Sequence, residues 1–138
     1  MSALLLRKKK TMSTELCLEA ETVEKSEVLK KWKMHLAEAQ KHPEILSTEL
    51  LWKVLDEVQQ NFFYTVKGIS FTYIIRGHEM FVNRKEKSIT QATVSLAARR
   101  VLEMQAQGIT ITGPKKIGTF GASYLFPIFL EIGLILTV

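Results

Sequence analysis

Cysteine is nearly absent from this sequence, because Cys17 is the only one among 138 residues. A single cysteine excludes an intrachain disulfide and every metal site that is built from paired cysteines. The three histidines, His35, His42 and His78, fall in separate parts of the chain without clustered acids, so we expect no metal site. No nucleophile stands beside a base that could activate it. The sequence therefore gives no positive sign of catalysis or of a cofactor.

Glycine and proline are missing from residues 14–41, so nothing there interrupts a helix. Apolar residues recur at helical spacing in this stretch and in two later ones, which each begin at a Ser or Thr suited to an N-cap. Between them lies a stretch rich in aromatic and β-branched residues, where Gly77-His78 fits a two-residue hairpin loop. The predicted elements are helices over about 25–41, 48–60, 90–107 and 119–136 and strands near 62–67, 70–76 and 79–84.

These elements predict the α+β class, with an N-terminal helical pair, a small antiparallel β-meander, a long helix and a buried C-terminal helix. A length of 138 residues is ordinary for one domain with its own core. We expect residues 25–138 to form a single α+β domain, preceded by a flexible segment, residues 1–24, that is first basic and then acidic.

The apolar end of the chain, residues 117–138, carries one charge, Glu131, and suits either a core helix or a membrane span. At about 1.5 Å per residue, a helix of this length could cross a hydrocarbon layer of roughly 30 Å. The glycines, the proline and the acid weaken insertion, and a mostly polar stripe recurs every four residues from Thr119 to Glu131. We expect a buried helix, with a tail-anchored membrane protein as the alternative.

Charge is unevenly distributed along the chain, whose net charge is +5. Residues 15–60 carry six basic and ten acidic side chains, whereas residues 61–100 carry seven basic and two acidic ones. Such polarity indicates an anionic partner, or one part of the protein docking onto another. The basic run at 7–10 fits a nuclear-import patch, a transit peptide or a solvated tail, and no secretory signal is predicted. We expect a cytoplasmic or nuclear protein, with a membrane or an organelle as alternatives.

The positive middle of the chain is also its most aromatic part, with six aromatic residues between positions 62 and 81. A sheet with an aromatic face and a basic rim could stack bases and bind phosphates. Alternatively, the aromatic residues face the core and the basic residues face water. The turn at Gly113-Pro114, followed by two lysines, could also hold an anion. The predicted anion or nucleic-acid contacts are Lys67, Arg76, Arg84, Lys85, Lys87, Lys115 and Lys116.

Two stretches, KSITQATVSLA and GPKKIGTFGASYLFPIF, resemble a family of small plant proteins of uncharacterised function, over about Phe71 to Ile135. The resemblance implies one compact module with a hairpin, a helix, a turn and a final helix, and it implies no catalytic residue. The residues themselves predict a non-catalytic intracellular interaction module that contacts nucleic acid or an acidic protein through its basic and aromatic β region. A tail-anchored protein with residues 117–138 as the anchor is the alternative.

Overall fold

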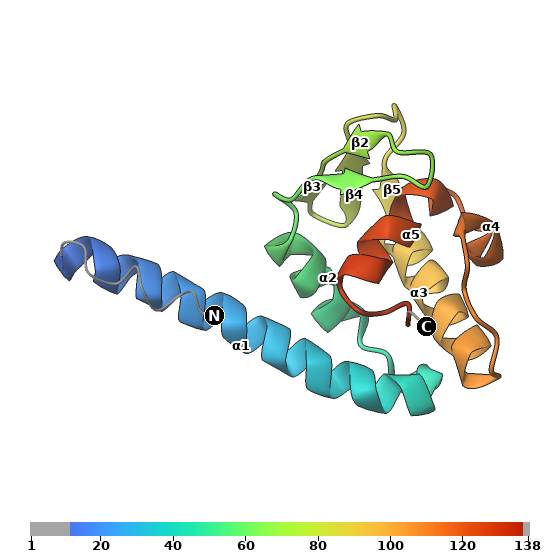
Figure 1. The fold of residues 1–138 in the computed structure, drawn as a ribbon, viewed down its shortest axis with the longest axis horizontal. Helices are drawn as coiled ribbons and strands as arrows, with labels where there is room; N and C mark the ends of the chain where they lie inside the picture. Colours follow the sequence, from blue (N-terminus) through green and yellow to red (C-terminus); the bar gives the residue numbers. More distant parts are fainter. Residues whose placement is uncertain (1–11, 137–138) are drawn as a thin grey trace.

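A computed structural model describes the backbone of residues 12–136 and the side chains of residues 27–136 (Figure 1). Helices and two small antiparallel sheets confirm the predicted α+β fold. The basic run at 7–10 lies outside the described residues. The elements are α1 (Met12–Lys41), the 3-10 helix η2 (Pro43–Ile45), α2 (Thr48–Glu57), β1 (Phe63–Tyr64), β2 (Ser70–Phe71), β3 (Tyr73–Arg76), β4 (Glu79–Val82), β5 (Ile89–Thr90), α3 (Gln91–Ala106), α4 (Pro114–Ile117) and α5 (Ala122–Glu131).

Helix α1 is longer than predicted, because it begins at Met12 instead of near residue 25. Without glycine or proline before Pro43, its sequence contains no internal helix stop. Trp32, Leu36 and Ala39 bury one face of its second half, which contacts η2, α2 and α3. Figure 1 shows the first half extending away from the other helices and strands. The helix thus joins a segment that forms part of the core to a segment that projects from it.

Two of the predicted helix starts are confirmed by their caps. The Ser47 hydroxyl accepts a hydrogen bond from the Leu50 amide at 3.1 Å, at the start of α2. The Thr90 hydroxyl accepts one from the Thr93 amide at 3.2 Å, at the start of α3. Each hydroxyl satisfies one of the free amides in the first turn of its helix.

The predicted single meander is wrong in detail, because its strands form two sheets. One sheet pairs β1 with β2, and the other has the order β3-β4-β5. Thr72 separates β2 from β3, and its amide donates to the Asn83 side chain at 3.0 Å instead of continuing a ladder. The hairpin between β3 and β4 turns at Gly77, with φ +60°, as predicted. Strand β5 was not predicted, since two residues are too few to show a period.

The C-terminal helix is shorter than predicted, because α5 spans only Ala122–Glu131. Gly121 and Gly133 bracket it in left-handed conformations, with φ of +75° and +81°, which end regular helix geometry. Leu125, Ile128 and Phe129 are fully buried in the core. Of the helices in residues 12–136, none combines the length and the apolar character that a membrane crossing requires.

Side chains of α1 and α3 hold the backbone that follows α5. The Trp32 indole N–H, itself buried, donates to the carbonyl of Ile132 at 2.8 Å. The Gln105 side chain donates to the Leu134 carbonyl at 3.0 Å and accepts from the Leu136 amide at 2.8 Å. These bonds satisfy backbone groups that have no sheet or helix partner. The last described residues are therefore tied to both α1 and α3.

Tyr73, at the start of β3, links the three-stranded sheet to α2 and makes the stability of the fold depend on pH. Its hydroxyl donates to the carbonyl of Leu55, in the last turn of α2, at 2.6 Å. Burial, with a smaller contribution from the nearby Asp56 carboxylate, raises the pKa of the Tyr73 phenol far above its ordinary value of about 10. Tyr73 therefore contributes its full share of folding stability below about pH 10. This share is lost as the pH rises further, because the phenol then ionises in the unfolded chain but not in the folded one.

We expect Tyr73→Phe to lower the free energy of unfolding by about 1–3 kcal/mol at neutral pH, since it leaves the Leu55 carbonyl unpaired. Urea unfolding measures this change, with Tyr64→Phe, whose side chain is exposed, as the control. The variant should also lose less stability than the wild type between about pH 9 and 11. Equal pH dependence in the two proteins would contradict the assignment.

Candidate functional site

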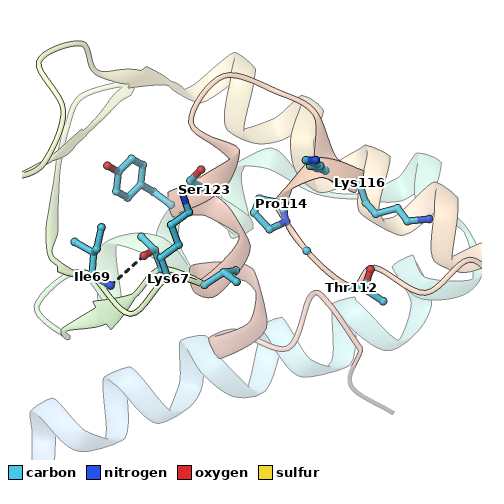
Figure 2. Close-up of a pocket in the computed structure, with 11 residues that line it drawn as sticks. Lys67, Ile69, Thr112, Pro114, Lys116 and Ser123 are labelled. Atoms are coloured by element: carbon cyan, nitrogen blue, oxygen red, sulfur yellow. Dashed lines mark hydrogen bonds between the residues drawn. The ribbon is translucent and has the colours of Figure 1, made fainter.

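A cavity of about 680 Å³ opens between the β1–β2 loop and α4, within the range of sites that hold small ligands. Three segments that are distant in the sequence form it: the β1–β2 loop, the turn that leads into α4, and the start of α5 (Figure 2). The lining residues are Thr65, Val66, Lys67, Ile69, Thr112, Gly113, Pro114, Lys115, Lys116, Ser123 and Tyr124.

The β1–β2 loop forms a wall of fixed shape. The Thr65 amide donates to the Ile69 carbonyl at 2.9 Å, and the Ile69 amide donates to the Thr65 hydroxyl at 3.1 Å. Gly68 completes the turn with φ +87°, a conformation that side chains disfavour. The loop therefore presents Val66 and Lys67, both exposed, at a defined place beside the cavity.

The opposite wall is set by Pro114 and by an arginine of α3. Pro114 occupies the first position of α4, where a backbone N–H makes no hydrogen bond within the helix, so proline costs nothing there. The Arg100 guanidinium donates to the Ile117 carbonyl at 3.0 Å, at the end of this four-residue helix. Lys115 and Lys116 lie between these two fixed points and are exposed. The short helix thus places both lysines at the opening.

The start of α5 supplies the third wall through Tyr124. Its ring meets the buried Phe71 edge-on, with ring centroids 5.0 Å apart. Phe71 in turn stacks on Phe63 at 5.7 Å across the β1–β2 sheet. The cavity is therefore built directly on the aromatic core, and the half-buried Tyr124 ring contributes to its apolar lining.

The charge of the lining has one sign. Of the side chains described from residue 27 to 136, the ionisable ones in the lining are Lys67, Lys115 and Lys116, apart from the phenol of Tyr124, and none is a carboxylate. Figure 2 shows Lys67 reaching toward Ser123 from the loop, whereas the Lys116 side chain points away from Lys67. Ammonium groups spread around an opening suit several separate negative groups better than a single one. The apolar walls suit a hydrophobic body between those negative groups.

The other four predicted contacts lie outside this lining. Arg76 faces Glu79 across the β3–β4 pair, and Lys87 is exposed in the segment before β5. The Arg84 Nε donates to the Ser70 carbonyl at 3.0 Å. The Lys85 ammonium lies 4.0 Å from the centre of the Phe120 ring, in a cation–π contact. Arg84 and Lys85 thus both make contacts that link neighbouring segments.

The six aromatic residues of the predicted β region divide between core and surface. Phe63, Phe71 and Tyr73 are buried, whereas Phe62, Tyr64 and Phe81 are exposed. This division follows from the alternation of side chains along short strands. On the outer face of β3 and β4, Phe81 faces Ile74 while Glu79 faces Arg76. That face therefore combines one aromatic ring with a carboxylate. This combination does not suit single-stranded nucleic acid, which needs several rings for its bases and positive charge for its phosphates.

Sequence reasoning missed the apolar and hydroxyl-bearing residues of the cavity, such as Ile69 and Tyr124. No sequence signal marks them, because the lining comes from three segments that only the fold brings together. Within the described side chains, no group of three or more His, Cys, Asp or Glu residues could hold a metal ion.

Comparison of this chain with protein-family models, curated proteins and solved structures finds no match. The resemblance to small plant proteins therefore stays a prediction, and so does the tail anchor.

Proposed function

We propose that this chain is a non-catalytic interaction module that binds an acidic segment of a protein partner in the cavity between the β1–β2 loop and α4. One observation carries the proposal: among the side chains that the structure describes, three lysines and no carboxylate surround a cavity with apolar walls. An acidic segment with hydrophobic side chains would place carboxylates against the ammonium groups and apolar groups against the walls.

Two further observations favour an acidic protein segment over nucleic acid. The predicted basic residues are dispersed, since only Lys67, Lys115 and Lys116 share one site. Nonspecific nucleic-acid binding depends on a continuous basic track with aromatic rings available for stacking. Here the outer face of β3 and β4 includes Glu79, and the apolar groups sit inside a cavity where a flat base stack has no platform.

A binding titration with variants of the cavity tests this proposal. The probe is a short, fluorescently labelled peptide rich in glutamate and leucine. Its binding is measured by fluorescence anisotropy at low salt. Replacing Lys67, Lys115 and Lys116 by glutamine should weaken binding roughly 3- to 100-fold. This range follows from the small binding energy of an exposed ion pair, summed over three pairs. Raising the salt concentration should weaken wild-type binding as well.

The matched control replaces Lys41, Lys53 and Lys87 by glutamine. All three are exposed and lie outside the cavity, so the control changes net charge equally without touching the site. Equal loss of binding in both triple variants would contradict the proposal, because it would show attraction to overall charge alone. Tighter binding of single-stranded oligo(dT) than of the peptide, with the same dependence on the cavity lysines, would assign the site to nucleic acid.

A further inference from the structure

The first half of α1 projects from the fold on a rigid base. The helix is continuous from Met12 to Lys41, and its second half is fixed by Trp32, Leu36 and Ala39 in the core. Figure 1 shows the first half leading away from the other elements. A helical segment of about 15 residues is only marginally stable in water without packing. Contact with another surface would therefore stabilise this segment considerably.

The sequence of the projecting segment matches the cavity in charge and in polarity. Residues 12–27 contain five glutamates and one lysine. Leu16, Ala20 and Val23 are spaced by four and three residues, which is the spacing of an apolar stripe along one side of a helix. The segment thus combines carboxylates with a narrow apolar stripe, whereas the cavity combines ammonium groups with apolar walls. Docking of an amphipathic helix into an apolar groove is a common mode of recognition.

The segment has no route to the cavity of its own chain. Reaching back would require a break in α1, yet residues 14–41 contain neither glycine nor proline to favour one. The core contacts of Trp32 and Leu36 fix the direction in which the helix leaves the fold. A second copy of the chain is free of both restrictions.

We propose that residues 12–27 of one copy dock into the lysine-lined cavity of a second copy, so that two chains associate by exchanging their projecting helices. The inference rests on the proposed function, because it names the acidic segment that the cavity binds. A reciprocal exchange fills both cavities and closes the assembly at two copies. The acidic part of each chain, residues 15–60, then contacts three lysines of its partner, of which Lys67 belongs to the basic stretch 61–100.

Charge reversal in the full-length chain tests the exchange. One variant replaces Glu15, Glu19 and Glu24 by lysine, and the other replaces Lys67, Lys115 and Lys116 by glutamate. Sedimentation velocity should show a dimer for the wild type at low salt. Each variant alone should associate at least about tenfold more weakly, because attraction becomes repulsion at several pairs. An equimolar mixture of the two variants should restore the dimer, since each helix then meets a cavity of opposite charge.

The control replaces Lys41, Lys53 and Lys87 by glutamate and should dimerise like the wild type. Circular dichroism verifies that each variant remains folded, and all the lysines concerned are exposed. A wild-type chain that stays monomeric, or a mixture that fails to restore association, would overturn the exchange. If such a monomer still binds the glutamate- and leucine-rich peptide through its cavity lysines, the proposed function stands and only the identity of the segment is wrong. If the wild-type chain stays monomeric and also fails to bind the peptide, both proposals fail.

Discussion

Replacing Trp32 by alanine is expected to lower the free energy of unfolding by about 3–5 kcal/mol, which is the cost of removing a large buried aromatic side chain. The side chain is 1% exposed, and its indole N–H donates to the Ile132 carbonyl at 2.8 Å. The substitution therefore removes core volume and also one link between α1 and the C-terminal segment. Urea unfolding followed by circular dichroism measures the change.

Trp32→Phe separates the two contributions. Phenylalanine keeps most of the ring but no donor, so the Ile132 carbonyl loses its partner at a cost of about 1–3 kcal/mol. A neutral Trp32→Ala substitution would show that the indole does not lie in the core. A Trp32→Phe variant as unstable as Trp32→Ala would assign the whole effect to the hydrogen bond.

Replacing Phe129 by alanine should be similarly damaging, at about 3–5 kcal/mol. Phe129 lies in α5 and is fully buried, with Leu125 and Ile128 beside it. The result bears on the two hypotheses for the apolar end of the chain, because a core helix loses folding stability when a buried ring is removed. Thermal and urea unfolding of the purified protein in detergent-free buffer both report the loss.

Phe62→Ala is the matched control, because Phe62 is 71% exposed. We expect its free energy of unfolding to change by no more than about 0.5 kcal/mol, as for other surface positions. Equal behaviour of the two phenylalanine variants would contradict the burial of α5. A wild-type chain that stays folded only in lipid or detergent would favour the tail anchor.

Local signals predicted much of the secondary structure. Helix α3 was predicted within one residue at each end, because Thr90 caps its start and Gly108, with φ +83°, follows its end. Gly77 likewise marks the β3–β4 hairpin. In each case the decisive residue acts on backbone within three positions of itself, so its effect can be predicted without knowledge of the fold.

Predictions failed where packing between distant segments decides the outcome. The apolar run at the C-terminus predicts a long helix, but α5 ends at Glu131, just before Gly133, and the backbone that follows the helix bonds to Trp32 and Gln105 instead. Hydrophobicity alone does not distinguish a buried helix from a buried irregular segment, because both need apolar side chains. The start of α1 was placed too late for a related reason, since the apolar stripe of its projecting half is narrow and gives a weaker helical period than the buried half.

The candidate site was predicted only in its charges. Lys67, Lys115 and Lys116 were among seven basic residues proposed from the sequence, and only the fold selects these three for one cavity. The apolar lining had no signal, because Val66 and Tyr124 belong to segments more than fifty residues apart. Binding sites assembled from loops depend on tertiary structure in this way, whereas caps and turns do not.

The most direct test of the proposed site is an NMR titration of the isotope-labelled full-length protein with the glutamate- and leucine-rich peptide. If the cavity is the binding site, the amide shifts will concentrate in residues 65–69 and 112–116 and at Ser123 and Tyr124. Changes confined to the outer face of β3 and β4, around Ile74 and Phe81, or no changes at a peptide concentration that saturates the anisotropy signal, would contradict it.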